Sequence, residues 1–335
     1  MRLLAAALVG CLALGGATSC QAQIPLRLEP YESGPLPGVP QDWVSSEIHC
    51  DDDGNLYIYE TLDDEANTSY VLRFDDHGQN LVRFEPGNVP ELRKLADWGR
   101  IAIGPRGEVY LVASEVDEQE NFVAAYVATF DRDGTFLRST RVEGGVEPRA
   151  LAAFGSGDWL ISGWEHRDGK QLPVTAVFSE RGQMQARVRM SGPKPKEAQR
   201  PPPEAEIQAL VLSALAVRAG NGDVMVGQGG SVYEIAPSGE VVRHFAILAP
   251  KGTALRKVRP FAGQIALLFE GTADPTGSSA PGVLRIVDPL TGHTTAEYAA
   301  DLSRLGRFAC ADDRGFSFVR SNQNLQLELV VARPQ

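Results

Sequence analysis

The stretch "IHCDDDGN", residues 48–55, combines three consecutive aspartates with a cysteine, and these residue types can bind metal ions or carry out redox chemistry. A calcium loop of the EF-hand type that began at Asp51 would need a bidentate glutamate at its twelfth position. That position is Leu62. Asp and Asn side chains also cap their own turns, and the following Gly54 tolerates positive φ. The pattern therefore favours a structural hairpin turn, with a calcium site as the alternative.

The other residues that could do chemistry do not form a catalytic motif. No short spacing suited to zinc relates the five histidines, which are His49, His77, His166, His244 and His293. The nucleophile elbow G-x-S-x-G is missing, and "GSSAP" at 277–281 only approaches it. The glycines of "GNGDVMVGQGG", 220–230, are not followed by the helix that a phosphate loop needs. We therefore predict no resident metal and no cofactor, and we assign no catalytic residue.

A repeated pattern organises the chain: an apolar strand, a tight glycine turn and a second apolar strand. It is seen in "IAIGPRGEVYLVAS" and "LAAFGSGDWLISGW" as well as in the opening stretch. The turn glycines recur at intervals of 41 to 65 residues and are Gly54, Gly107, Gly157, Gly222, Gly263 and Gly315. In most units a second hairpin follows, such as "VATFDRDGTFLRST". Repeats of this length in an all-β pattern indicate blades of four short strands stacked around an axis.

The two ends of the chain are expected to complete one blade together. Six units account for residues 43–335, but the last has only three evident strands and ends with "LQLELVVAR". We expect "IPLRLE", residues 24–29, to supply the missing outer strand. Such pairing would close the ring and remove two exposed sheet edges.

These repeats resemble those of six-bladed β-propellers of the NHL or TolB type, in the form found among exported bacterial proteins. The resemblance covers nearly the whole chain after its N-terminal segment. Its motif, apolar-x-D-x-x-G-x-apolar-Y, is a signature of the fold and not of catalysis, and the fourth and fifth units lack the Asp. The resemblance implies an all-β fold, a six-bladed propeller with four-stranded antiparallel blades.

Two cysteines, Cys50 and Cys310, lie within the repeats. Aligning "DDDG" with "DDRG" places Cys310 opposite His49, one residue out of step with Cys50. Since alternate strand residues point to opposite faces, this offset puts the two thiols on facing sides of the last and first blades. The hypothesis is a disulfide that closes the ring a second time in an oxidising compartment, with two unpaired buried thiols as the alternative.

The resemblance also implies which face carries function. In such propellers the innermost strand starts on the ligand-binding face, and long loops such as "TLDDEANTS" and "GTADPTGSSAPG" belong there. Arginine forks match carboxylates and phosphates, so arginines at the starts of inner strands are candidate contacts for an anionic ligand, with ordinary strand-flanking charge as the alternative. These residues are Arg100, Arg149, Arg256 and Arg307. The candidate aromatic contacts, which would stack on sugars, anchor a protein or fill gaps between blades, are Trp43, Trp98 and Trp164.

The N-terminus predicts export. "MRLLAAALVGCLALGGATSCQAQ" has one arginine, an apolar run and then small residues, which is typical of a secretory signal over residues 1–22. A lipoprotein signal that ends at residue 19, with lipidation of Cys20 and a membrane anchor, is the alternative. Residues 23–335 are predicted to form a single propeller domain, with the proline-rich stretch 191–206 as a flexible insertion.

The formal charge of −11 disfavours nucleic acid, because phosphate binding depends on clustered Lys and Arg. We therefore expect a non-catalytic, monomeric, periplasmic or secreted propeller that binds a partner protein, an envelope glycan or an anionic ligand through its long-loop face. One alternative is a calcium-dependent lactonase or esterase, a chemistry that the resemblance implies. Its candidate carboxylates near the loop face are Glu47, Glu60, Glu165 and Glu270. The other alternative is a purely structural scaffold of the envelope.

Overall fold

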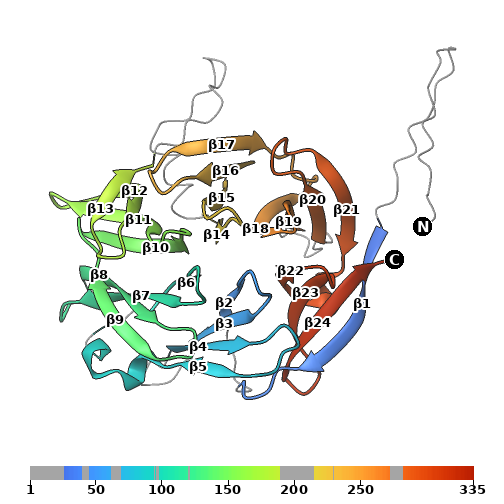
Figure 1. Cartoon of the computed structure of the whole chain (residues 1–335), viewed down its shortest axis with the longest axis horizontal. Helices are drawn as coiled ribbons and strands as arrows, with labels where there is room; N and C mark the ends of the chain where they lie inside the picture. Colours follow the sequence, from blue (N-terminus) through green and yellow to red (C-terminus); the bar gives the residue numbers. More distant parts are fainter. Residues whose placement is uncertain are drawn as a thin grey trace, which may run out of the picture.

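The computed structural model describes residues 26–39, 45–61, 69–93, 95, 98–119, 121–188, 215–228, 230–271 and 282–335. These residues form mainly antiparallel sheets arranged around a central axis, and the strand that comes first in each repeat lies nearest that axis (Figure 1). The signal segment, Cys20, Trp43 and the insertion at 191–206 lie outside the described residues.

Four sheets have four strands each, in chain order. The first contains β2 (Ser45–Cys50), β3 (Leu56–Thr61), β4 (Ser69–Phe74) and β5 (Val82–Phe84). The second contains β6 (Ile101–Ile103), β7 (Val109–Val116), β8 (Phe122–Phe130) and β9 (Phe136–Arg141). The third contains β10 (Val146–Ala153), β11 (Trp159–Arg167), β12 (Lys170–Phe178) and β13 (Met184–Arg187). The fourth contains β14 (Leu215–Arg218), β15 (Val224–Gln228), β16 (Ser231–Ile235) and β17 (Val241–Ala246).

The other eight strands form one continuous sheet in the order β18-β19-β20-β21-β1-β24-β23-β22. Their bounds are β18 (Thr253–Phe261), β19 (Gln264–Gly271), β20 (Gly282–Val287), β21 (Thr294–Ala300), β1 (Leu26–Pro35), β24 (Leu327–Pro334), β23 (Phe316–Ser321) and β22 (Arg307–Ala311). Among the described residues, the short helices η1 (Pro86–Asn88) and η2 (Pro90–Leu92) connect the first sheet to the second, and α2 (Leu302–Leu305) connects β21 to β22 within the eight-stranded sheet. No helix in the described part of the chain is long and apolar enough to cross a membrane.

The N-terminal strand β1 explains why the sheet has eight strands. It pairs antiparallel with the C-terminal strand β24, from Leu28 opposite Pro334 to Pro35 opposite Glu328. It also pairs parallel with β21 through Leu26 and Arg27. The two ends of the chain therefore meet as the sequence suggests, over a longer strand than 24–29. The sequence predicts separate four-stranded sheets. Here eight strands form one continuous sheet, because β1 pairs with both β21 and β24.

Neighbouring sheets pack face to face through apolar side chains. Between the first and second sheets, Tyr59 and Phe84 lie in one buried cluster with Leu111 and Phe130. The rings of Phe84 and Phe130 meet edge to face, with their centroids 6.2 Å apart. A strand such as β7, buried along most of its length, must have neighbours on both faces. Stacked four-stranded sheets around an axis make this chain an all-β propeller.

The aspartates before the turn glycines stabilise the hairpins. The Asp51 Oδ1 accepts the backbone N–H of Asp53 at 3.0 Å and of Asn55 at 2.9 Å, and its Oδ2 accepts the Tyr57 hydroxyl at 3.0 Å. Gly54 has a φ of +82°, where a side chain would be strained. The carboxylate of Asp51 therefore bonds within its own turn, as the predicted structural hairpin requires.

Candidate functional site

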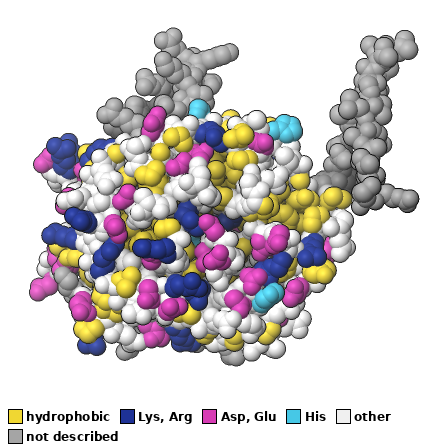
Figure 2. Space-filling model, viewed as in Figure 1, with side chains coloured by type: hydrophobic (Ala, Val, Ile, Leu, Met, Phe, Trp, Pro, Cys, Tyr) yellow, Lys and Arg dark blue, Asp and Glu magenta, His cyan; other side chains and the backbone are white. Residues whose placement is uncertain are grey.

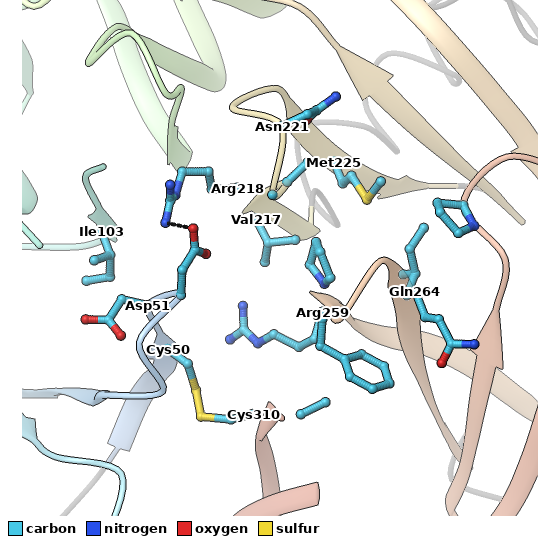
Figure 3. A pocket seen from close by; sticks show the side chains of 18 of the residues that line it. Cys50, Asp51, Ile103, Val217, Arg218, Asn221, Met225, Arg259, Gln264 and Cys310 are labelled. Carbon is cyan, nitrogen blue, oxygen red and sulfur yellow. Dashed lines mark ion pairs between the residues drawn. A yellow bond between two sulfur atoms is a disulfide. The ribbon is translucent and has the colours of Figure 1, made fainter. Parts of the chain in front are cut away.

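A cavity of about 860 Å³ lies on the axis, at the ends of the inner strands where the tight hairpin turns begin (Figure 3). Small apolar side chains supply much of its wall, among them Ala102, Leu151, Ala153, Ala216 and Val217. The disulfide cysteines and the turn aspartates border it on one side, and Phe261 and Ile265 on another. This is the end of the channel opposite the starts of the inner strands, and the arginines predicted from sequence do not line it.

Arg259 is the charged side chain that enters this cavity from its wall, and Figure 3 shows its guanidinium directed toward the centre. It is only 6% exposed. Its Nε donates to the Ala309 carbonyl at 2.8 Å, and its Nη2 donates to the Ile48 carbonyl at 2.7 Å. Its Nη1 donates to no described residue. Burial lowers the pKa of Arg259 to about 10, and the charge of Glu47 opposes this shift.

Lys257 lies two residues before Arg259 on β18, so both side chains leave the same face of the strand. Its Nζ donates to the same Ile48 carbonyl, at 3.3 Å. Burial lowers the pKa of Lys257 to about 7, and the charges of Arg259 and Arg307 act in the same direction. Two cationic side chains thus converge on one carbonyl oxygen inside the channel.

Glu47 is the nearest counter-charge to these cations. Its Oε2 bonds the His49 Nε2 at 3.0 Å, and its Oε1 accepts the Arg100 Nη1 at 2.6 Å. Burial acts to raise the pKa of Glu47, but His49 and Arg100 together lower it to about 2. Burial lowers the pKa of His49, with help from the charges of Arg259 and Lys257 and against the effect of Glu47. Five charged or titratable groups, Glu47, His49, Arg100, Lys257 and Arg259, therefore interact with one another near the axis.

The cavity mouth carries pairs of opposite charge. Arg218 Nη2 lies 2.5 Å from the Asp52 carboxylate, an ion pair drawn in Figure 3. Asn221 donates to the Glu234 Oε1 at 2.6 Å, and Arg243 lies 3.5 Å from the other oxygen of Glu234. These arginines are already neutralised by carboxylates, unlike Arg259, whose hydrogen-bond acceptors are carbonyl groups.

The arginines predicted from sequence lie at the other mouth of the channel. Arg100 Nε donates to the Arg149 carbonyl at 2.9 Å, so these two do come together. Arg149 pairs with Glu147, and Arg256 lies 3.8 Å from Glu270. Burial lowers the pKa of Arg307. Two of the four, Arg149 and Arg256, fall at register shifts of β10 and β18, where a bulge re-aims the side chain.

The predicted tryptophans are placed differently from one another. Trp98 packs against the core between the first and second sheets, and its carbonyl accepts the Tyr59 hydroxyl at 2.7 Å. Trp164 lies within β11, paired with Glu147 and Pro173, so its assignment to a connection is wrong. Strand β11 continues to Arg167, which is farther than its hydrophobic residues suggest. For Trp98 the structure supports the gap-filling alternative.

The carboxylates considered as calcium ligands do not meet. Glu47 bonds His49 and Arg100, Glu165 bonds Arg187 at 2.6 Å, and Glu60 is buried in the first sheet. Within the described ranges no three His, Cys, Asp or Glu side chains come close enough to hold a metal ion. On the face seen in Figure 2, acidic and basic side chains are interspersed over the sheets, consistent with many local ion pairs.

Cys50 and Cys310 form a disulfide, with their Cα atoms 5.9 Å apart. The bond links β2 in the first sheet to β22 in the eight-stranded sheet and borders the cavity. It lies within the same layer of the channel as Arg259, which also contacts both of these strands. The disulfide joins β2 to β22, and the hydrogen bonds of Arg259 join β18 to both. Together these links hold three inner strands around the cavity.

Sequence reasoning missed Lys257, Arg259, His49 and Arg218. One signal was available: "LRKVRPF" places basic residues at alternate positions of an inner strand, where a side chain faces the axis. The prediction from sequence instead selected arginines at the starts of the inner strands. Whether each basic side chain has a carboxylate partner depends on contacts between different sheets. The spacing of residues along the chain does not contain that information.

No family model matches the chain, and no curated protein matches its sequence. Among solved structures, a protein of unknown function from Dyadobacter fermentans shares 10% identity, covers 92% of this chain and 99% of its own, and has a TM-score of 0.50. A protein of unknown function from Bacteroides caccae shares 14% identity over 80% and 85% of the two chains, with a TM-score of 0.49. TolB from Acinetobacter baumannii shares 14% identity over 86% and 67%, with a TM-score of 0.46. Likeness at these identities concerns the fold alone.

Proposed function

We propose that this chain is an exported, non-catalytic β-propeller that binds a small anionic ligand in its axial cavity. The observation that carries the proposal is Arg259, whose buried guanidinium has carbonyl partners and is directed into the cavity. A charge removed from water is costly unless a counter-charge accompanies it. A carboxylate or phosphate in the cavity would supply that counter-charge and accept two parallel hydrogen bonds.

The rest of the cavity suits a small organic anion. Its volume of about 860 Å³ falls in the range of small-molecule sites, about 300–1,000 Å³. Apolar walls from the second, third and fourth sheets face the basic side chain, the usual arrangement of a ligand pocket with one polar anchor. The carboxylates at the mouth would disfavour highly charged anions. We therefore propose a monocarboxylate or dicarboxylate, or a sugar acid, in preference to a polyphosphate.

Four finer features belong to the same proposal: the number of blades, the propeller type, export and the monomeric state. We count the eight-stranded sheet as two blades that share β1 at their outer edges, which gives six blades with the ring closed by the N-terminal strand. The NHL or TolB type, export and the monomeric state remain parts of the proposal. A partner protein at the long-loop face is the second candidate, favoured by the paired Arg100 and Arg149 at that mouth.

Calorimetry and thermal shift with succinate, glucuronate, galacturonate and glucose 6-phosphate test the proposal. A ligand at a hundredfold excess over its Kd should stabilise the fold by about 2.7 kcal/mol. We expect binding of at least one carboxylate by the wild type, its loss in Arg259→Gln, and partial retention in Arg259→Lys. Arg218→Gln is the matched control, because Asp52 already pairs with that arginine.

Two results would contradict the cavity proposal. One is that no anion in the panel binds the wild type. The other is that Arg149→Ala removes binding while Arg259→Gln, shown to be folded by circular dichroism, retains it. The second result would place the site at the opposite mouth and support the long-loop face.

A further inference from the structure

The inner strand β18 places an amine and a guanidinium side by side inside the channel. Lys257 Nζ and Arg259 Nη2 contact the same carbonyl oxygen, that of Ile48, at 3.3 and 2.7 Å. The Lys257 amine therefore lies beside the guanidinium that lines the cavity, although Lys257 itself is not part of the cavity wall. Val258, between them in sequence, points the other way into the apolar cluster of the fifth repeat, which confirms the alternation.

Lys257 is half-buried, and it has no carboxylate partner among the described residues. Among the described residues it forms no ion pair within 4.0 Å, while the nearby charges include two guanidiniums, on Arg259 and Arg307. Glu47 and Glu270 act on it only from a greater distance. A desolvated lysine beside other cations loses its proton readily, and the neutral amine is the nucleophilic form. The lowered pKa of Lys257, about 7, agrees with this geometry.

We infer that Lys257 forms a reversible imine with a small oxo acid, a carbonyl compound that also carries a carboxylate, which Arg259 holds. This inference rests on the proposed function, because the carboxylate contact is the one proposed there. It adds to that proposal a second functional group on the ligand, the carbonyl, and a covalent bond between the ligand and Lys257. The apolar wall formed by Ala216 and Val217 would accommodate the remainder of a short-chain ligand.

The chemistry balances without an oxidant or a reductant. The lone pair of Nζ attacks the carbonyl carbon, the carbon–nitrogen bond forms, and a proton moves from nitrogen to the former carbonyl oxygen. The carbinolamine then loses that oxygen as water while nitrogen gives up its second proton and the carbon–nitrogen double bond forms. His49 lines the cavity and lies near Lys257, and its lowered pKa keeps it neutral, so it can relay these protons.

Reductive trapping tests the inference on the purified wild-type protein. The protein is incubated with glyoxylate or pyruvate at pH 7.5 with sodium cyanoborohydride, and peptide mapping by mass spectrometry locates the reduced adduct. We expect the peptide that contains Lys257 to be modified at least tenfold faster than peptides with the exposed Lys170 or Lys251. Acetaldehyde, which has a carbonyl but no carboxylate, should label Lys257 more slowly, and acetate should compete with glyoxylate.

The variants separate this inference from the function on which it rests. Lys257→Arg should lose the adduct and keep succinate binding, while Lys251→Arg, the matched control, should keep both. Modification spread over exposed lysines with Lys257 unlabelled would overturn the inference, even if succinate still binds. Failure of the wild type to bind any anion of the panel would instead remove the proposed function.

Discussion

The Arg259 guanidinium on β18 donates a 2.7 Å hydrogen bond to the carbonyl of Ile48 on β2, 211 positions earlier in the chain. A second bond, to Ala309, engages β22, the inner strand that lies between them. One buried side chain thus ties three inner strands together at the axis. The same bonds fix the guanidinium before any ligand arrives, so binding would cost little side-chain entropy.

Replacement of this arginine should therefore destabilise the fold as well as remove ligand binding. Arg259→Met removes the side-chain donor of the Ala309 carbonyl and leaves the Ile48 carbonyl with the longer bond from Lys257, and we expect it to lower the free energy of unfolding by ~1–3 kcal/mol. Urea denaturation followed by tryptophan fluorescence measures the loss. Arg218→Met removes an ion pair with the exposed Asp52 and should cost under ~1 kcal/mol. Equal stability of Arg259→Met and the wild type would show that the cross-channel bonds contribute nothing.

The disulfide predicts a strong dependence of stability on redox state. Cys50 and Cys310 are 260 positions apart, and the chain-entropy estimate for such a long loop is about 4–5 kcal/mol. We expect Cys310→Ser, or reduction of the wild type, to lower the denaturation midpoint substantially. The double variant Cys50→Ser/Cys310→Ser is the control and should not respond to reductant. A rise in intact mass from alkylation of both cysteines under denaturing conditions without reductant would show that the bond is absent.

Much of the architecture could be predicted from the sequence because it depends on local patterns. Glycine turns flanked by apolar strands predicted four-stranded units, and the aspartates before Gly54 and Gly134 predicted capped hairpins. The pairing of β1 with β24 followed from a missing strand in the last unit. Because the hairpin pattern recurs along the chain, the prediction made for one unit supports the prediction made for the others.

The candidate site was not predicted because it depends on contacts between distant segments. Arg259 is special because it meets carbonyls of Ile48 and Ala309, whereas the nearby Arg218 meets a carboxylate. Sequence spacing treats these two arginines alike. The formation of one eight-stranded sheet also depends on how far β1 reaches toward β21, which is a matter of register between these two strands.

Glu47 should stabilise the protein in a pH-dependent manner. Its pKa in the fold is about 2, below the ordinary 4.5, so its contribution is fully present above about pH 4.5 and is lost as the pH falls toward 2. Glu47→Gln should therefore reduce stability by ~2–3 kcal/mol at pH 7 and by much less at pH 2.5. Chemical denaturation at both pH values measures this difference. A deficit that is the same at both would contradict the assignment, and Asp313→Asn on the exposed turn serves as the control.

Glu60 should change the stability with pH in the direction opposite to that of Glu47. It is 1% exposed, and burial raises its pKa to about 7, a shift that the Tyr70 hydroxyl and the Arg83 guanidinium only partly oppose. The folded state then binds more protons than the unfolded state between about pH 4.5 and 7, so stability falls as the pH rises through this window. Glu60→Gln removes the titration and should raise Tm above pH 7.5 by about 2–4 °C, the response to roughly 1 kcal/mol in a chain of this size. Glu165→Gln is the matched control: its carboxylate pairs with Arg187 at 2.6 Å, and removing it should not raise Tm. If Glu60→Gln is less stable than the wild type at pH 8 and the wild type shows no loss of Tm between pH 5 and 8, the carboxylate has an ionised partner in the fold.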